Sequence, residues 1–309
     1  MSAGFTPRRI LVTGASSGIG RCVALRLAAQ GHTVYAGARQ AQDLAALAAV
    51  PGVHALALDV CRPDDVAAAA QRIAKAGGLY GLVNNAGIGG LGPLHSWTDA
   101  ELLQLFDTNV FGPQRTSRTL LPLLLAARGR IVHIGSQGGS ISSRWFGPYT
   151  MSKHALEAFA LCQREELAPH GVAVSIVQPG GVVSEIGAKG AAGTRLRFER
   201  AATDTALPFV NQAQAVLAQF AQPAAYRADE PESAHNRKLS PPEAVAAAVE
   251  DALFAPQPRL RYLVGTRWEG DRVLHTLVQR LLDANDSPNM HYTRDELVAL
   301  LDVQLAGRS

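Results

Sequence analysis

The sequence predicts an α/β protein built on a doubly wound parallel sheet with helices on both faces. Two observations predict it: short, nearly continuous apolar segments alternate with longer helical patterns, and a glycine-rich turn joins the first segment to the first helical pattern. Strands of a parallel sheet are buried on both faces and are therefore almost wholly apolar. The segments with this character are Arg9–Thr13, Thr33–Ala36, Val53–Leu58, Leu79–Val83, Arg130–Ile134, Ala173–Val177 and Arg261–Val264.

Helical patterns fill the intervals between these segments. Gly31 suits a helix C-cap, Pro63 suits a first helical turn, and Thr98 with Glu101 has the spacing of a capping box. Repeated strand–helix units of this length imply parallel strands. Helices are expected over Ser17–Gln30, Asp43–Val50, Pro63–Ala76, Tyr149–Ala168, Phe209–Phe220, Val273–Leu282 and Arg294–Leu305, after Thr98, and from Ser240–Glu243 to Phe254.

The chain of 309 residues is expected to form a single domain, residues 1–309. Its core spans residues 7–265 and includes a substrate loop at 185–240, where the strand–helix pattern weakens. Within this loop the polar segment Gln222–Lys238 is expected to lie over the site. Residues 266–309 form a C-terminal helical extension that is expected to pack on the main domain.

The composition excludes several classes of protein. Hydrophobic residues make up 47% of the chain and charged residues 18%, which suits a sizeable core, and the net charge of +3 gives no reason to expect a nucleic-acid partner. Cys22, Cys61 and Cys162 lack metal-ligand spacing and are expected to be small buried side chains in a reducing compartment. The dispersed histidines predict no metal site. The N-terminus lacks a signal-peptide pattern and Leu120–Ala127 is too short to span a bilayer, so a cytoplasmic protein is expected.

The glycine-rich turn Thr13–Gly20 (TGASSGIG) lies between the first strand and the first helix. Glycines let the backbone turn tightly and approach a pyrophosphate, and the helix N-terminus offers free N–H groups and a partial positive charge. In this strand–turn–helix context the motif indicates a Rossmann-type sheet that binds a dinucleotide. The residues assigned to the cofactor here are Gly14, Ser16, Ser17, Gly18, Ile19 and Gly20.

The end of the second strand bears on which dinucleotide is bound. NAD sites often place a carboxylate there for the ribose 2′-hydroxyl, whereas this chain has Gly37-Ala38-Arg39. The planar guanidinium of Arg39 can donate to a 2′-phosphate through two hydrogen bonds. The sequence therefore favours NADP(H), with NAD(H) left open.

Tyr149 and Lys153 stand four positions apart on a predicted helix, so their side chains share one face. A nearby ammonium favours the phenolate, and Lys153 is therefore expected to lower the pKa of Tyr149 from its usual value of about 10. Such a tyrosine can donate and accept a proton near neutral pH. Ser136, thirteen residues before Tyr149 at the end of a strand, strengthens the interpretation.

With these residues in order, the chain resembles the short-chain dehydrogenase/reductase family over Pro7–Gly265. The resemblance rests on Thr13–Gly20, the run Asn84–Gly87 (NNAG), Asn109, Ser136, the Tyr149/Lys153 pair, and Pro179 with Gly180. It implies that Tyr149 protonates the carbonyl oxygen during reduction and that Lys153 holds the nicotinamide ribose. It implies that Ser136 binds the substrate oxygen and stabilises its developing charge. Asn109 would hold the water of a proton relay.

The same resemblance assigns the rest of the cofactor site. Asp59 and Val60 would meet the adenine, and Ser184, which stands where the family usually has threonine, would lie near the phosphates. The centre of the groove would be lined by Asn85, Ala86 and Gly87, and the carboxamide would be flanked by Pro179, Gly180 and Val182.

The substrate is expected to be a small hydrophobic carbonyl compound or alcohol. The strand end Val34–Arg39, the length and the C-terminal part are similar to the 17β-hydroxysteroid and retinol dehydrogenase-like branch, which implies a steroid, a retinoid or a similar molecule. Val182, Val183 and Ile186 suit an apolar pocket. Trp145 and Phe146, just before Tyr149, either wall this pocket or serve ordinary packing.

Two other functions stay open at this level. One is a 3-ketoacyl-thioester reductase of the same family. The other is a non-catalytic dinucleotide sensor, which would be expected to lack Tyr149, Lys153 or Ser136. Members of the family are commonly homodimers or homotetramers, so a homo-oligomer is expected.

Overall fold

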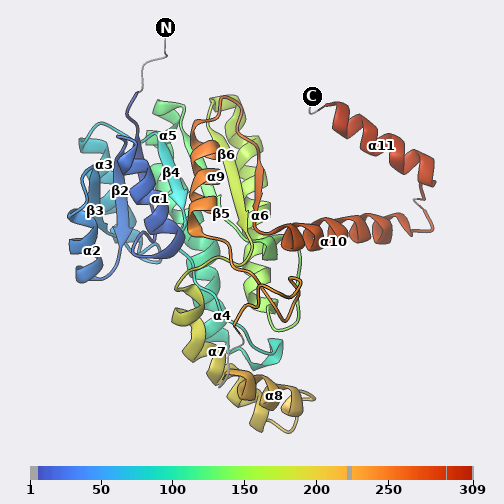
Figure 1. Ribbon diagram of the computed structural model, residues 1–309. Helices are drawn as coiled ribbons and strands as arrows, with labels where there is room; N and C mark the ends of the chain where they lie inside the picture. The colour runs from blue at the N-terminus through green and yellow to red at the C-terminus, as the bar shows by residue number, and fades with distance from the viewer. Residues whose placement is uncertain (1–5, 221–224, 290, 308–309) are drawn as a thin grey trace.

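The computed structural model describes residues 6–220, 225–289 and 291–307. Its centre is a seven-stranded parallel sheet in the order β3-β2-β1-β4-β5-β6-β7, so the predicted doubly wound α/β fold is confirmed (Figure 1). The order reverses between β1 and β4, and the carboxyl ends of strands at such a switch point form the usual crevice for a ligand. The strands are β1 (Arg9–Val12), β2 (Thr33–Ala38), β3 (Val53–Ala57), β4 (Gly81–Asn84), β5 (Arg130–Ile134), β6 (Ala173–Pro179) and β7 (Arg261–Val264).

Helices cover both faces of the sheet and form two separate apolar cores with it. One core joins β1 to α1, α2 and α9, through side chains such as Val23, Leu47 and Val249. The other joins the opposite face to α3, α5 and α6, through Ile73, Leu124 and others. The helices are α1 (Gly18–Ala29), α2 (Ala41–Ala48), α3 (Pro63–Lys75), α4 (Asp99–Phe106), α5 (Gly112–Ala127), α6 (Gly147–Leu167), α7 (Ile186–Thr203), α8 (Val210–Phe220), α9 (Pro242–Phe254), α10 (Arg267–Asn285) and α11 (Arg294–Ala306).

Helix α7 is the main element that the sequence did not predict. Glycine is a poor helix former, and α7 contains Gly187, Gly190 and Gly193. Tertiary contacts supply the reason: a Cβ at Gly190 would lie 2.7 Å from the carbonyl oxygen of Gly89. Phe198, further along α7, is fully buried against α8. Helices α7 and α8 therefore form a small layer of their own beyond the carboxyl ends of the strands (Figure 1).

The segment after α8 is irregular from residue 225 to Ser240. The predicted polar stretch Gln222–Lys238 begins in residues 221–224, which lie outside the described residues. Two residues of its described part, Ala234 and Arg237, line a cavity. Leu239, just after the stretch, lines the same cavity.

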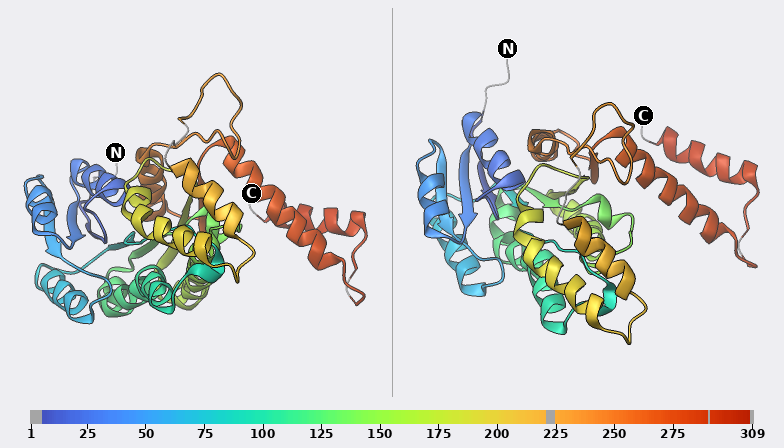
Figure 2. Two further views of the ribbon diagram at one scale, coloured as in Figure 1. Left: turned by 90° about the horizontal axis from the view of Figure 1, so that it is seen from below. Right: turned by 60° about the horizontal axis from the view of Figure 1, so that its bottom comes forward.

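The C-terminal helices differ from the expectation that they pack on the main domain. Only Glu269 and Val273, near the start of α10, are buried, and no described residue of α11 is. Beyond its first two turns α10 projects away from the sheet, and α11 lies beside it at a distance from the body of the protein (Figure 2). The leucines of α10 beyond its first two turns are exposed, and so are most leucines and valines of α11. Too few apolar contacts therefore reach the core to hold the tail against it.

No helix in the described part of the chain is both long and apolar enough to cross a membrane. Over the same residues, no group of three or more His, Cys, Asp or Glu side chains is placed to hold a metal ion. Cys22 and Cys61 are partly buried, and burial raises the pKa of each thiol, for Cys61 to about 11. Cys162 is exposed, contrary to the expectation of a buried side chain.

Candidate active site

The glycine-rich turn after β1 is fastened to the end of β4. The Thr13 hydroxyl accepts hydrogen bonds from the backbone N–H groups of Asn85 and Ala86, both at 3.0 Å. The Asn85 side-chain amide donates in return to the carbonyl oxygens of Thr13 and Gly14, both at 2.9 Å. The turns after β1 and β4 therefore form one rigid surface, the floor of the site, because each turn satisfies backbone groups of the other.

Two glycines of this floor are required by its geometry. Gly14 has φ +62°, and a Cβ there would lie 2.8 Å from Cα of Ala86. A Cβ at Gly20 would lie 2.3 Å from the Asn85 amide nitrogen. The helix N-terminus at Gly18 has no side-chain cap, so its N–H groups face outward to a ligand. The two glycines and the helix N-terminus suit a pyrophosphate. The residues predicted for this turn are therefore suited to a dinucleotide.

A groove of about 840 Å³ runs from this floor along the carboxyl ends of the strands. Tyr149, the predicted proton donor, lines it, and so does every residue assigned above to the cofactor: Gly14, Ser16, Ser17, Gly18, Ile19, Gly20, Arg39, Asp59, Val60, Asn85, Ala86, Gly87, Lys153, Pro179, Gly180, Val182 and Ser184. The fold thus brings together in one groove residues that span most of the chain.

The end of the groove at β2 and β3 holds Arg39 and Asp59. Arg39 is 65% exposed, and its guanidinium lies 3.8 Å from the Asp59 carboxylate. An exposed pair at this distance contributes little energy, so Arg39 keeps its freedom to reorient. Asp59 is fixed from the other side because its Oδ1 accepts from the N–H of Cys61 at 3.0 Å.

The start of α7 covers the glycine-rich turn. Lys189 donates from Nζ to the hydroxyl of Ser17 at 2.9 Å and pairs with Glu185 at 2.8 Å. Ser184 abuts Gly18, where an added Cβ would lie 3.2 Å from the serine Cβ. Lys189 also lines the groove and brings a positive charge to the phosphate end, a contribution that the sequence pattern did not reveal.

Ser136, Tyr149 and Lys153 meet at the other end of the groove. Ser136 follows β5, and its hydroxyl accepts from the N–H of Gly138 at 3.0 Å. Tyr149 lies in the first turn of α6 and hydrogen-bonds with Ser136. Lys153, one turn later and almost completely buried, donates from Nζ to the carbonyl oxygen of Ile134 at 2.9 Å. Its Nζ is 5.8 Å from the centre of the Tyr149 ring.

The pKa shifts at this end differ from the sequence-based expectation. Burial raises the pKa of Tyr149, against the opposing effect of its hydrogen bond with Ser136. Burial also lowers the pKa of Lys153 to about 8, although the Glu157 carboxylate works in the other direction. The prediction that Lys153 depresses the pKa of Tyr149 is therefore wrong for the protein alone, because desolvation of the phenolate has the largest influence and raises this pKa.

Asn109 lies in a π-helical turn, Asp107–Phe111, between α4 and α5. Its side-chain oxygen accepts from the N–H of Ile88, and its amide donates to the carbonyl oxygen of Ile88, both at 2.9 Å. The amide also donates to Ser152 at 3.1 Å. Asn109 therefore positions the loop after β4 against α6, and π-turns of this kind are frequent at functional sites.

His133 lies directly beneath this end of the groove and is fully buried. Its Nε2 lies 2.9 Å from the Gln163 side-chain oxygen, and its Nδ1 lies 3.3 Å from the Asn84 amide nitrogen. This arrangement suits a neutral ring with its proton on Nε2. Burial lowers the pKa of His133 to about 4, and the nearby Lys153 ammonium adds to the effect.

We expect His133 to make the protein sensitive to acid. The unfolded ring takes up a proton near pH 6.5, whereas the folded ring does so only near pH 4, so the stability it supports is complete above pH 6.5 and is lost as the pH falls towards 4. In His133→Asn the fall in unfolding free energy between pH 7 and pH 4 should be smaller by roughly 3 kcal/mol. Urea unfolding over this range measures the slope, with exposed His170→Asn as control. Parallel curves for wild type and His133→Asn would refute the assignment.

A second cavity, of about 900 Å³, opens beside the groove. Ser136 and Tyr149 line both spaces, and so do Gly89, Pro179 and Ile186. Apolar side chains of the cavity wall come from separate parts of the chain: Leu91, Ile141, Phe146, Ile186, Phe220 and Leu239. The expected substrate pocket thus lies where the Ser136 and Tyr149 hydroxyls can reach it.

Phe146 and Trp145 have different places in this site. Phe146 lines the cavity. The Trp145 ring turns away into the layer of α7 and α8, with ring centres 5.7 Å from Phe198 and 5.9 Å from Phe209. Its backbone has φ +71°, an unusual value for a bulky residue, which this packing maintains. The pocket-wall assignment of Trp145 is therefore wrong, and the packing alternative holds.

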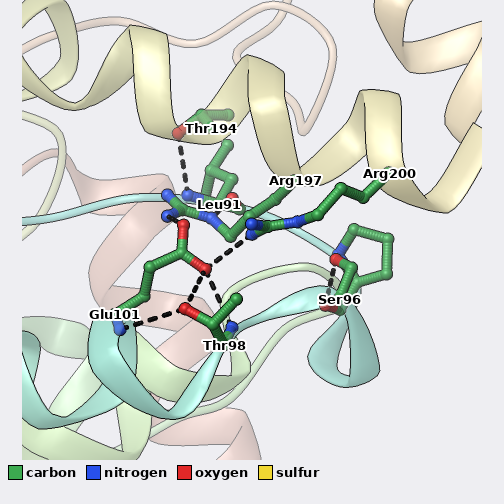
Figure 3. A network of polar contacts seen from close by, with 8 residues as sticks. Leu91, Ser96, Thr98, Glu101, Thr194, Arg197 and Arg200 are labelled. Atoms are coloured by element: carbon green, nitrogen blue, oxygen red, sulfur yellow. Dashed lines mark hydrogen bonds and ion pairs between the residues drawn. The ribbon is translucent and has the colours of Figure 1, made fainter.

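An ion-pair network fixes α7 over the cavity (Figure 3). Glu101 of α4 accepts from Arg197 at 3.0 Å and from Arg200 at 2.6 Å, and its carboxylate also closes the capping box with Thr98. Burial alone would raise the pKa of Glu101, but the Thr98 backbone and Arg200 outweigh it and lower the pKa. The Leu91 N–H donates to Thr194 of α7 at 3.0 Å. Sequence analysis predicted the capping box but not this second use of Glu101.

Glu269 is the most buried carboxylate near the site, with no exposed surface. Its Oε1 pairs with Arg237 and accepts from the N–H of Gly181 at 2.7 Å, and its Oε2 accepts from the N–H of Thr266 at 3.2 Å. It therefore ties the turn after β6 to α10. Its capping-box spacing with Thr266 was the available signal, but that spacing does not reveal burial.

The parallel sheet, its strand order and the glycine-rich turn at the switch point define a class of protein, the Rossmann-type dinucleotide-binding proteins. Residues 8–193 match the short chain dehydrogenase family. The chain belongs to this family.

Comparison with known proteins gives relatives of the expected kind. The chain is 35% identical over 260 residues to the uncharacterized oxidoreductase YbbO of Escherichia coli K12. This match covers 83% of this chain and 85% of that protein. It is 41% identical over 179 residues to mouse retinol dehydrogenase 5, and this match spans only 55% of each chain. A short-chain dehydrogenase structure from Streptomyces avermitilis has a TM-score of 0.71 at 28% identity, covering 91% of this chain and 95% of the other.

Proposed function

We propose that this protein is an NADP(H)-dependent oxidoreductase that interconverts a carbonyl and a primary or secondary alcohol on a hydrophobic substrate. The observation that carries the proposal is the position of Ser136 and Tyr149. Both side chains line the dinucleotide groove and the apolar cavity, so they stand where the two spaces meet. A group at this junction can act on a substrate atom while that atom faces the cofactor.

The roles follow from the chemistry of the side chains. The bound nicotinamide supplies or accepts the hydride. Ser136 donates a hydrogen bond to the substrate oxygen, and Tyr149 gives that oxygen a proton in reduction and takes one in oxidation. Lys153, anchored on the carbonyl oxygen of Ile134, holds a positive charge beside the phenol and bonds the cofactor ribose. Apolar walls at Phe146 and Ile186 suit a hydrophobic substrate, as does the similarity to retinol dehydrogenase 5.

The preference for NADP(H) is supported by charge. Arg39 lies at the groove end that would receive the adenosine ribose and is held there only by a weak contact with Asp59. A phosphate on the ribose 2′-oxygen would gain charge-assisted hydrogen bonds from the Arg39 guanidinium.

We expect Arg39→Ala to weaken NADPH binding by about tenfold or more and to change NADH binding less than twofold, because only NADPH carries the 2′-phosphate. Titration followed by nicotinamide fluorescence measures both constants. Arg62→Ala removes the same charge from an exposed position after β3 and serves as control. An equal loss for both cofactors, or tighter NADH binding by the wild type, would contradict the proposed NADP(H) preference.

A further inference from the structure

The apolar cavity has positive charge on its wall. Arg195 of α7, Arg237 and Arg272 of α10 line it, and no aspartate or glutamate is among the lining residues that the structure describes. Cationic side chains beside apolar surface lose part of their hydration. A nearby anion offsets the energetic cost of that loss. Acidic partners inside the protein therefore decide how much of this charge remains for a ligand.

Arg237 and Arg272 are neighbours because both contact one indole. The guanidinium carbons lie 5.6 and 4.8 Å, respectively, from the centre of the Trp268 ring. Contact with an aromatic face restrains a guanidinium in place, since cation and ring attract each other. Both arginines are therefore held by one indole, although one precedes α9 and the other lies within α10.

The described acidic residues compensate the three arginines unequally. Arg195 pairs with Glu199 at 2.7 Å on the surface of α7. Arg237 pairs with Glu269, but its Nε is buried and has no hydrogen-bond partner among the described residues. Arg272 has only its ring contact with Trp268, and no ion pair to a described residue. Donor capacity for a ligand thus remains on Arg272, since the Nε of Arg237 is buried and Glu269 already compensates the charge of Arg237.

Arg272 lines the same cavity as Ser136 and Tyr149, and Arg237 lies at the turn after β6. A Cβ at Gly181, directly after β6, would be 3.3 Å from Nη2 of Arg237. A Cβ at Gly180 would be 2.8 Å from the amide nitrogen of Gln137, the residue that follows Ser136. The turn after β6 therefore contacts both Arg237 and the residue next to Ser136.

We propose that the substrate is an apolar oxo acid or hydroxy acid whose carboxylate is bound by Arg272. The inference rests on the proposed oxidoreductase function and names the substrate class for the same site. A carboxylate has two oxygens that accept from guanidinium donors, and an apolar chain suits the remaining wall.

The first test is binding of an unreactive ligand, because it does not depend on turnover. Decanoate and decanamide have the same chain and differ in charge, and isothermal titration calorimetry measures both on the purified protein. We expect decanoate to bind about tenfold more tightly than decanamide at low salt. Arg272→Ala should abolish this difference, whereas Arg267→Ala, an exposed arginine of the same helix that pairs with Asp271, should preserve it.

The second test is turnover of oxodecanoates and their methyl esters with NADPH. We expect the acids to have the higher kcat/KM, and Arg272→Ala to lower it about tenfold for the acids and less than twofold for the esters. Equal binding of decanoate and decanamide, an equal loss in Arg267→Ala, or a preference for esters or acyl thioesters would overturn the carboxylate site. Arginine-dependent decanoate binding with no reduction of any carbonyl would instead leave the site standing and reject the proposed function.

Discussion

Replacing Tyr149 with phenylalanine is expected to lower kcat about a thousandfold, while the protein keeps its fold and its affinity for the cofactor. The substitution removes one oxygen from a half-buried ring in the first turn of α6, and that oxygen is the group that hydrogen-bonds with Ser136. General acid–base catalysis by a positioned side chain contributes about 10²- to 10⁴-fold to a rate. Lys153 keeps its own bond to the Ile134 carbonyl, so the groove should remain intact.

Steady-state reduction of a hydrophobic ketone, together with a fluorescence titration of the cofactor, measures the two quantities separately. Tyr80→Phe is the matched control, because it also removes one phenolic oxygen. The Tyr80 hydroxyl donates to the Leu253 carbonyl at 3.2 Å, and Tyr80 lines neither the groove nor the cavity. A Tyr149→Phe protein that retains more than a tenth of the wild-type kcat would show that another group moves the proton.

Replacing Glu269 with alanine is expected to destabilise the protein by about 3–5 kcal/mol. The carboxylate has no exposed surface, and its loss would leave Arg237 without its counter-charge and the Gly181 N–H without an acceptor. Thermal unfolding should show a melting temperature lower by roughly 5–10 °C. Glu269→Gln keeps the shape but not the charge and should fall between wild type and Glu269→Ala.

The chain offers a matched control for this prediction at α11. Thr293 and Glu296 form the same capping box as Thr266 and Glu269, but on a helix without buried residues. Glu296→Ala should therefore cost only about 1 kcal/mol or less, because water replaces the lost partner. Similar costs for the two substitutions would mean that burial and the Arg237 pair add nothing to the capping box.

Local sequence patterns were sufficient for the strands and for most of the helices. The apolar runs that became β1, β4, β5 and β6 are almost wholly buried, as short strands of a parallel sheet with helices on both faces are expected to be. The glycine-rich turn is local in one respect, because Gly14 adopts a φ that other residues avoid. The lack of room for a Cβ at Gly20 is instead a tertiary property, because it depends on the side chain of Asn85.

The sequence by itself determined the α/β class with its parallel, doubly wound sheet, and the set of residues that line one groove. Tertiary structure alone decided the rest. Helix α7 forms despite its glycines because Gly190 fits against Gly89 and Phe198 is buried, and Trp145 turns away from the cavity into that packing. Burial, and not the nearby Lys153, sets the direction of the Tyr149 pKa shift. The Arg237–Glu269 pair joins residues 32 positions apart. Desolvation and contacts between distant segments depend on the folded surroundings of a side chain, which no local pattern encodes.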